Sequence, residues 1–423
     1  MRLKFYYYLK TGIDIESLHH TSSRLFKICI MKQHSREEKF FVSTEEPEDI
    51  QVVRTKDEFI YDRHGKRYID FNAGWCVGNL GWRRKEIQSK INPTKIPDYI
   101  APGYHYQGWV DLAELLASIA PGELQKSVRA TGGTEAVEAA MQIAMLYTGR
   151  TKFLSVEGSY HGNSIGTLSI GTSENREQFK NLLPNCIKIT PPLDDNAADK
   201  VETKLKKRDI AALIMEPVIC NLGVMIPEHA FMKSISALCR RYGTLLVMDE
   251  VACGFGRTGK LFACEHFEIQ PDVLCVAKAI TAGYVPMGAC ITTAKIASKV
   301  LKKGFQFYST YGWHPLAVEA AIANIRYWKK NKEKILRNVA TLSQCFTDRL
   351  SQMKFKKGAT LRILGLAIGI EVSDSNYADQ IQQKSLKKGL LFTTEENTLT
   401  FFPSLTMRQA IAEEGLEILK SCL

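Results

Sequence analysis

The chain has 423 residues, 45% of them apolar and 24% charged, which is typical of a folded enzyme of two domains and argues against a disordered or fibrous protein. The formal net charge is +11, but the basic residues stand in short, scattered groups such as KLKKRD at 204–209, so we expect no nucleic-acid partner. The 11 cysteines include no CxxC pair and are expected to be reduced thiols of a cytoplasmic protein.

The first 30 residues give few structural signals. Their apolar run FYYYL is too short for the core of a signal peptide, and Asp14 and Glu16 argue against a transit peptide. No apolar run approaches the roughly 18 residues of a membrane-spanning helix, so no membrane partner is expected. We interpret residues 1–30 as a tail or a misassigned start, with Met31 as the alternative first residue.

The segment EFIYDRHGKRYIDF at 58–71 predicts a β-hairpin, because alternating apolar residues flank a turn at 62–65. From about residue 110, helical patterns at 109–120 and 134–149 alternate with short apolar runs. These runs predict strands at 152–157, 210–217, 244–251, 272–277 and 288–293. Strands that alternate with helices predict an α/β fold, in which helices cover both faces of a mainly parallel sheet.

After Pro315 the sequence predicts two long helical stretches, and then strands and a last helix within 361–372, 390–395, 399–405 and 407–421. Together with the N-terminal hairpin, these elements predict a smaller α+β domain formed by the N- and C-terminal parts. The expected division is an N-terminal part of the small domain at 31–74, a large ligand-binding domain at 75–312 and a C-terminal part of the small domain at 313–423.

The segment ATGGTEAVEAA at 130–140 puts a glycine-rich turn ahead of a strong helix pattern. Ligands of open parallel sheets bind at the carboxyl ends of the strands, where such turns lie. Gly133 and Thr134 would offer backbone N–H groups to a phosphate, because helix N-termini attract anions. The alternative interpretation is an ordinary helix cap made by Thr134.

The segment TLLVMDEVACGFGRTG at 244–259 ends an apolar strand with Asp249 and Glu250. Its GFGRTG matches the dinucleotide pattern G-x-G-x-x-G, but the acids precede the glycines and no sustained helix follows, so we reject a dinucleotide site. A carboxylate at the end of a buried strand needs a cationic partner. A protonated heterocyclic nitrogen would serve Asp249.

Lys278 stands between apolar residues in PDVLCVAKAITAGYVPMGA at 271–289. Burial lowers the pKa of a lysine by up to roughly 3–5 units, which leaves a neutral amine. A neutral amine forms Schiff bases with carbonyl compounds. The alternative is a lysine whose stem is buried while its ammonium group reaches solvent.

A phosphate cradle, a strand-end aspartate and a strand-end lysine together suggest pyridoxal 5′-phosphate (PLP) as the ligand. At this point the sequence resembles the class III PLP-dependent aminotransferases of fold type I. The resemblance runs from about residue 50 to the end and rests on an ordered set of motifs: GGTEAVEAA at 132–140, SYHG at 159–162, MEPV at 215–218, MDEVACGFGRTG at 248–259, PDVLCVAKAITAGYVPMGA at 271–289 and TYGWHP at 310–315.

The resemblance implies catalytic and phosphate-binding roles for matched residues. Lys278 would hold the cofactor as a Schiff base and then shuttle a proton. Asp249 would pair with the pyridine nitrogen and keep it protonated, which makes the ring an electron sink. Gly133 and Thr134 would bind the phosphate.

The resemblance also implies roles around the ring and the substrate. Tyr160 and Val251 would cover the two faces of the pyridine ring. Thr310 would reach the phosphate of the neighbouring subunit, so we expect a homodimer with shared active sites. Trp75 and Glu216 would line the substrate pocket, and no metal is expected.

Two departures from the family's pattern concern the substrate. Many members carry an arginine two residues after the YHG signature and another shortly before a C-terminal proline pair, whereas here Ser164 and Thr400 stand at about these points. Without a guanidinium, recognition of an α-carboxylate lacks its usual provider. Glu216 would then be free to bind an amine, unless another arginine moves in. We therefore expect an ω-amine or an unusual amino donor rather than ornithine or acetylornithine, and we interpret His161 as structural.

The expected function is that of a PLP-dependent aminotransferase. It would move an amino group between an amine or amino acid donor and an oxo acid or aldehyde acceptor, in ping-pong half-reactions through Lys278. The alternative is another reaction on the same cofactor, such as that of a semialdehyde 2,1-aminomutase, a racemase or a decarboxylase, because these also need Lys278 and Asp249. A non-catalytic scaffold is disfavoured, since it has little use for a buried lysine and aspartate.

Overall fold

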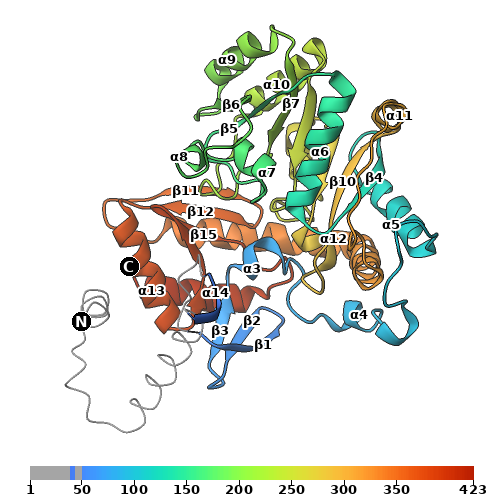
Figure 1. Ribbon diagram of the computed structural model, residues 1–423. Helices are drawn as coiled ribbons and strands as arrows, with labels where there is room; N and C mark the ends of the chain where they lie inside the picture. Colours follow the sequence, from blue (N-terminus) through green and yellow to red (C-terminus); the bar gives the residue numbers. More distant parts are fainter. Residues whose placement is uncertain (1–38, 43–49) are drawn as a thin grey trace. The chain divides into compact units, whose positions relative to one another are not determined.

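The computed structural model describes residues 39–42 and 50–423 (Figure 1). The tail predicted for residues 1–30 and the alternative start at Met31 lie outside the described residues.

The described residues fall into two compact units, namely 39–42, 50–53 and 62–64 in the first, and 54–61 with 65–423 in the second. In the first unit, an oxygen of the Asp62 carboxylate accepts a hydrogen bond of 2.8 Å from the backbone N–H of His64, within the predicted turn. The second unit contains every element of the candidate site and is described below by itself.

The large sheet has seven strands in the order β4-β10-β9-β8-β7-β5-β6. Neighbours from β9 to β6 pair in parallel, whereas β10 runs antiparallel to both β9 and β4. The predicted mainly parallel sheet is therefore confirmed. Its strands are β4 (Leu124–Ala130), β5 (Lys152–Val156), β6 (Cys186–Ile189), β7 (Ile210–Met215), β8 (Leu245–Asp249), β9 (Val273–Val276) and β10 (Gly288–Thr293).

Helices cover both faces of this sheet, as predicted (Figure 1). Helix α6 (Gly133–Thr148) lies on one face, and its alanines share a core cluster with Val247. Helices α9 (Asp195–Leu205) and α10 (His229–Tyr242) contribute to the other core cluster, which contains Leu246. Successive side chains of a strand point to opposite faces, so these two neighbouring residues of β8 belong to different cores.

The edge strands β4 and β6 of the large sheet were not predicted from the sequence, because neither has the apolar run of a central strand. Only the first and last residues of β4 are buried, so LQKSVRA contains no apolar run. The short strand β6 contains Lys188 and has one fully buried residue, Ile189. The other helices and 3₁₀ turns that the structure describes between residues 73 and 302 are α3 (Ala73–Cys76), α4 (Lys85–Gln88), η2 (Pro93–Lys95), α5 (Gln107–Ala117), α7 (Ile165–Ile170), α8 (Asn175–Gln178), η3 (Ala263–Phe267), η4 (Lys278–Thr281) and α11 (Ala294–Lys302).

After Pro315 the structure has one long helix, α12 (Pro315–Ser351), where the sequence predicted two helical stretches. The charged run at 329–334 interrupts the apolar pattern, but it lies mainly on the exposed face of the same helix. Trp328 and Ile335 remain buried on either side of it, so the helix continues without a break.

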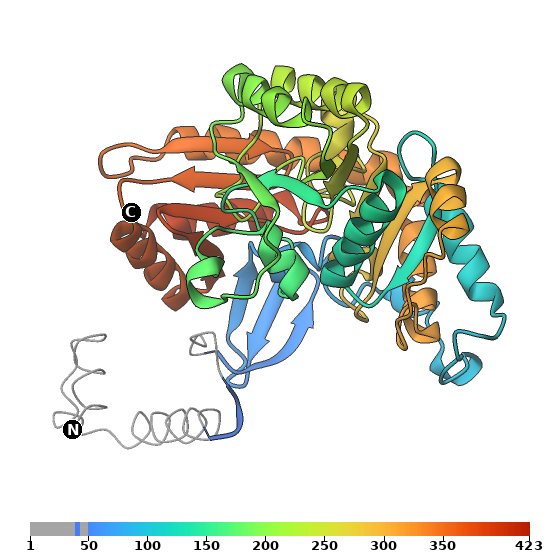
Figure 2. The same ribbon diagram turned by 45° about the horizontal axis from the view of Figure 1, so that its top comes forward.

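The smaller sheets are formed by both ends of the chain, which confirms the predicted small α+β domain. Strand β13 (Leu390–Leu391) pairs in parallel with β3 (Arg67–Asp70), whose other neighbour is β2 of the predicted hairpin. A further antiparallel sheet has the order β11-β12-β15-β14 and appears in orange and red in Figure 2. The remaining elements of these regions are β1 (Val52–Lys56), β2 (Phe59–Asp62), β11 (Thr360–Leu364), β12 (Ala367–Glu371), α13 (Ser375–Lys387), β14 (Thr393–Glu395), β15 (Thr398–Phe401) and α14 (Gln409–Lys420).

Candidate active site

Lys278 and Asp249 lie at adjacent strand ends of the large sheet. Asp249 is the last residue of β8 and stands opposite Cys275 of β9, and Lys278 follows the end of β9. Asp249 is buried, whereas Lys278 is half-buried and has a φ of 45°. A left-handed backbone at a residue other than glycine costs about 1–3 kcal/mol, and such strain gathers at functional sites. The fold thus brings together the two residues that the sequence singled out.

The Asp249 carboxylate accepts hydrogen bonds from two groups. His161 Nδ1 lies 2.7 Å from Asp249 Oδ2, and the Val251 N–H donates to Asp249 Oδ1 at 3.1 Å. Because a carboxylate only accepts, Nδ1 carries the proton of the first bond. His161 is buried, and its Nε2 lies 3.1 Å from Ser159 Oγ. This contact could not be predicted from the sequence, since nothing in SYHG distinguishes a structural histidine from one that holds an acid.

Glu250, the next residue, serves the fold instead of the site. Its carboxyl oxygens accept the backbone N–H groups of Ala263 at 2.9 Å and Cys264 at 2.7 Å, at the start of η3. Complete burial raises the pKa of Glu250 to about 7. The two neighbouring acids therefore have different partners and different roles.

The N-terminus of α6 is open. The helix begins at Gly133, its cap is Gly132, and no side chain caps it. Thr134 is not the cap residue, so the alternative interpretation of an ordinary threonine cap is wrong. The first N–H groups of a helix have no acceptor within the helix, which leaves the amides of Gly133 and Thr134 to an anion.

Glycines allow the chain to approach this helix end closely. A Cβ atom on Gly162 would lie 2.4 Å from Thr134 Oγ1, and one on Gly133 would lie 3.0 Å from Val251 Cγ1. Gly162 also has a φ of 130°, which side-chain-bearing residues rarely adopt. Open amides beside a glycine-lined approach fit the phosphate group of PLP.

Tyr160 presents an open ring on an anchored backbone. Its side chain is 52% exposed. Its N–H donates to Asn221 Oδ1 at 3.2 Å, and Asn221 Nδ2 donates to the Gly158 carbonyl at 2.8 Å. An exposed ring on a fixed loop is what stacking on a ligand requires.

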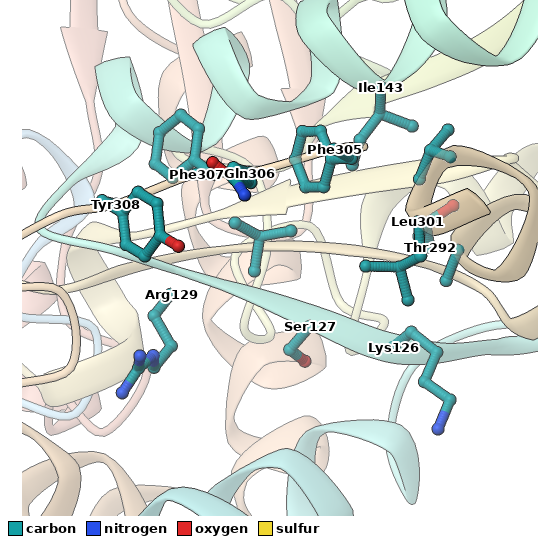
Figure 3. Close-up of a pocket in the computed structure, with 13 residues that line it drawn as sticks. Lys126, Ser127, Arg129, Ile143, Thr292, Leu301, Phe305, Gln306, Phe307 and Tyr308 are labelled. Atoms are coloured by element: carbon teal, nitrogen blue, oxygen red, sulfur yellow. The ribbon is translucent and has the colours of Figure 1, made fainter. Parts of the chain in front are cut away.

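Thr310 is exposed in the segment between α11 and α12. Its neighbour Ser309 donates a hydrogen bond of 3.0 Å to Glu135 in the first turn of α6. The preceding residues border a cavity of about 390 Å³ that β4, β10 and α11 also line (Figure 3). Tyr308 and Tyr311 are 78% and 64% exposed. A single chain therefore leaves the surroundings of Thr310 uncovered.

Glu216 is buried just after β7, and its only described hydrogen bond is a long one, 3.4 Å, from the Cys220 N–H. Burial first, and then the charge of Asp249, raise the pKa of Glu216 well above its usual range, although Lys278 opposes this. Burial and the neighbouring Asp249 therefore both disfavour the charged form of Glu216.

The positions where many family members carry arginines are engaged in the fold. Thr400 is fully buried on β15, and its hydroxyl donates to the Thr393 carbonyl at 3.1 Å. The Ser164 side chain caps α7 by accepting the Thr167 N–H at 3.1 Å. Neither residue offers a cation to a substrate carboxylate.

Trp75 belongs to a left-handed turn. The four residues of α3 (Ala73–Cys76) have φ values of 48°, 60°, 57° and 66°. Asn72 Oδ1 accepts the Trp75 N–H at 2.9 Å and helps to hold this conformation. The half-buried indole ring lies 6.0 Å from the ring of buried Phe402. Two aromatic rings therefore come together at this turn.

Residues 41–423 match a family model described as aminotransferase class III. An acetylornithine aminotransferase of Archaeoglobus fulgidus is 33% identical over 386 residues, which cover 91% of this chain and 98% of that protein. An adenosylmethionine-8-amino-7-oxononanoate aminotransferase of Staphylococcus aureus is 29% identical over 418 residues, which cover 89% of this chain and 92% of that protein.

Solved structures share the fold over nearly all of the chain. The taurine:2-oxoglutarate aminotransferase of Bifidobacterium kashiwanohense, in complex with PLP and glutamate, has a TM-score of 0.85 at 25% identity, covering 93% of this chain and 97% of that one. A Bacillus anthracis aminotransferase has a TM-score of 0.85 at 25% identity, covering 96% of this chain and 99% of that one.

Proposed function

The chain belongs to the class III aminotransferases, which use pyridoxal 5′-phosphate, and on that premise we propose which residues carry the reaction and which donors they accept. The activity is the transfer of an amino group between a small amine or amino acid and an oxo acid or aldehyde. We propose that Lys278 holds the cofactor and that the donor is an ω-amine. The observation that carries the first proposal is the position of Lys278 and Asp249 at adjacent strand ends, near the open end of α6.

Asp249 and the start of α6 would fix the two ends of the cofactor. PLP, when bound, supplies an electron sink for the substrate carbon. Asp249 would hold a proton on the pyridine nitrogen, because its carboxylate keeps accepting capacity beyond the bonds from His161 and Val251. The amides of Gly133 and Thr134 would bind the phosphate.

Three side chains would act on the ring and the reacting bond. Val251, whose Cγ1 would lie 3.0 Å from a Cβ on Gly133, would cover one ring face, and the exposed ring of Tyr160 would cover the other. Lys278 Nζ would act as the base that moves a proton during the transfer.

The donor proposal rests on the residues that would surround the substrate. The positions of Ser164 and Thr400 provide no guanidinium for an α-carboxylate. The carboxyl of Glu216 is buried with a single long hydrogen bond, and it would accept one from an amine. Trp75 beside Phe402 adds an apolar wall. An amine whose reacting end lacks a neighbouring carboxylate suits this set of groups better than an α-amino acid.

We also propose a homodimer in which Thr310 of one chain reaches the phosphate of the other. Support comes from the exposure of Thr310 and of the large side chains Leu301, Tyr308 and Tyr311 in the same region. The cavity of Figure 3 lies along this segment, so a second copy would cover apolar surface that one chain leaves open.

None of the helices in the described part of the chain is long and apolar enough to cross a membrane. The ten cysteines within the described residues are all free thiols. We propose a cytoplasmic location, because reducing compartments keep thiols unpaired.

A panel of amino donors tests the donor proposal. The purified enzyme with bound PLP is mixed with short diamines, ω-amino acids, N-acetylornithine, ornithine and alanine, without an acceptor, and loss of the cofactor's absorption band is followed. ω-Amines should react about tenfold or more faster than α-amino acids, the size of effect that a missing bidentate carboxylate contact produces. Alanine, an α-amino acid, as the fastest donor would contradict the proposal. Repeated turnover without any added oxo acid would point to an aminomutase or another PLP reaction instead.

A further inference from the structure

Arg257 is a fully buried cation, and its three closest hydrogen-bond acceptors are neutral. Its Nη1 donates to the carbonyls of Leu366 and Pro403, at 3.0 and 2.5 Å, and its Nη2 donates to Asn79 Oδ1 at 2.7 Å. Its Nε has no hydrogen-bond acceptor among the described residues. A buried guanidinium that is not balanced costs several kcal/mol, so a counter-charge is required nearby.

The sulfur of Cys76 supplies that counter-charge. Cys76 is 1% exposed, and among the groups that act electrostatically on Arg257 it is the strongest, ahead of Asp70. Burial by itself would raise the pKa of the Cys76 thiol. A hydrogen bond with Cys220 and the charges of Arg257 and Lys278 outweigh burial and lower that pKa to about 6. These groups therefore favour the thiolate form of Cys76.

Cys220 is the second thiol of the pair. It is 2% exposed in the loop after β7, where its N–H donates to Glu216. The hydrogen bond with Cys76, and then burial, raise the pKa of Cys220 well above its usual range, so Cys220 stays protonated. Both cysteines belong to one buried cluster, against which the Trp75 ring packs. A thiolate beside a thiol is the arrangement from which a disulfide forms.

We propose that Cys76 and Cys220 are a redox-active thiol pair beside the substrate pocket, which a hydroperoxide converts to a disulfide. The Nε of Arg257 has no hydrogen-bond acceptor in the described part of the chain, which supports a negatively charged sulfur nearby. A lone, neutral buried cysteine would not balance this cation. The proposal concerns the chain's own thiols and stands whether or not the donor is an ω-amine.

The chemistry balances in two steps. The Cys76 thiolate attacks one peroxide oxygen, so that an S–O bond forms, the O–O bond breaks, and the hydroxide that leaves takes up a proton as water. The sulfur is oxidised to a sulfenic acid while the peroxide is reduced. The Cys220 sulfur then attacks the Cys76 sulfur, an S–S bond forms, and the sulfenic oxygen leaves as water with the proton of Cys220.

The disulfide would change the surroundings of the two proposed substrate residues, Trp75 and Glu216. It would tie the left-handed turn that carries Trp75 to the loop that follows Glu216. It would also remove the anion that balances Arg257. Because Trp75 and Glu216 are the proposed substrate residues, we expect oxidation to raise the KM for the donor more than it lowers the affinity for PLP.

The test treats the holoenzyme with hydrogen peroxide, blocks the remaining thiols after denaturation, and maps the peptides by mass spectrometry. The expected product is a linked pair of peptides containing Cys76 and Cys220, with a loss of two hydrogen atoms from the intact mass. In Cys220→Ser, oxidation should stop at a sulfenic acid on Cys76, which dimedone traps. Reversal by dithiothreitol should restore the donor KM.

Cys275 and Cys290 provide a matched internal control. They stand directly opposite each other on β9 and β10, are fully buried, and also form a thiol–thiol hydrogen bond. The pKa of Cys275 is raised well above its usual range by that bond and by burial, so this pair should remain reduced. Oxidation of the control pair before the proposed pair, or no linked peptide at all, would overturn the proposal.

The pH dependence gives a second readout that needs no variant. The groups that act on Cys76 are Cys220, Arg257, Lys278 and Glu216. Since the thiolate is the nucleophile, the rate of disulfide formation should fall about tenfold between pH 7 and pH 5. A rate that instead rises only above pH 8 would show an ordinary thiol and contradict the proposal, even if Cys76→Ser or Cys220→Ser failed to fold.

Discussion

His161 Nδ1 lies 2.7 Å from Asp249 Oδ2, and this bond joins the loop after β5 to the end of β8. Both side chains are buried, so the carboxylate that would face the cofactor cannot turn freely. His161 is thus a positioning residue for Asp249, and the loop that holds it also carries Tyr160. One hydrogen bond therefore fixes the acid and the stacking residue relative to each other.

Replacing His161 with phenylalanine is expected to weaken PLP binding by about tenfold, because Asp249 loses a hydrogen bond of about 1–3 kcal/mol. Titration of the apoenzyme with PLP, followed by absorbance, measures this. His161→Gln keeps a donor and should recover most of the affinity. If both variants lost thermal stability but bound PLP equally well, His161 would have only a structural role.

Replacing Lys278 with alanine should abolish turnover and the absorption band of the covalently bound cofactor, because no other amine replaces its Nζ. Spectra of the variant after gel filtration report both covalent attachment and retention. Lys278→Arg provides the control, since it keeps the charge but not the nucleophile, and it should behave like the alanine variant. Normal turnover by either variant would refute the assignment.

Replacing Asp249 with alanine should leave weak PLP binding and little activity, because the pyridine nitrogen would lose its proton. Steady-state kinetics at saturating PLP separate the two effects. Wild-type rates in this variant would contradict the electron-sink role.

Gly162→Ala is expected to weaken PLP binding by about tenfold, because its Cβ would lie 2.4 Å from Thr134 Oγ1 and displace a residue of the phosphate cradle. Gly149→Ala is the matched control. Gly149 also has a positive φ, 73°, but a Cβ there meets nothing within 4 Å at the far end of α6. Gly149→Ala should lose about 1 kcal/mol of stability, Gly162→Ala should lose more because of the added clash, and only Gly162→Ala should lose affinity for PLP. Equal affinities would argue against the cradle.

Glu250 should make the free energy of unfolding fall as pH rises. Its native pKa of about 7 lies above the ordinary 4.5, so the folded state binds more protons between these values. The contribution is complete below the unfolded pKa and is lost as pH rises through about 7, by about 2–3 kcal/mol from pH 5 to pH 8. Urea unfolding of the wild type and Glu250→Gln at both pH values measures the difference. A constant difference between the two proteins would contradict this.

Thr310→Ala should weaken phosphate binding in the assembled dimer, since the hydroxyl would act across the interface. PLP titration combined with light scattering tests the idea. Thr203→Ala, at an exposed threonine of α9, is the control and should change neither property. A fully active monomer would contradict the shared site.

The central strands of the large sheet were predictable, because every residue of β7, β8 and β9 is buried and their sequences are apolar runs, apart from Asp249 at the end of β8. Edge strands lack this signal, as β4 shows. The position of Lys278 and Asp249 followed from the rule that ligands collect at strand ends.

The surroundings of the site could not be predicted from local patterns. Arg257 was seen only as part of a glycine pattern, because its partners come from three distant segments of the chain, at Asn79, Leu366 and Pro403. The left-handed turn around Trp75 is equally hidden, since three of its four residues are not glycine. Only tertiary contacts make such conformations stable.

The parallel pairing of β13 with β3, through Leu390 and Ile69, has a consequence for synthesis of the chain. The hairpin of β2 and β3 leaves the ribosome early, whereas the strand that completes its outer edge is made near the end of translation. Until then β3 exposes an unpaired edge, the kind of surface on which aggregation begins. A ribosome-stalled chain that ends before β13 should therefore depend on chaperones more than one that includes it.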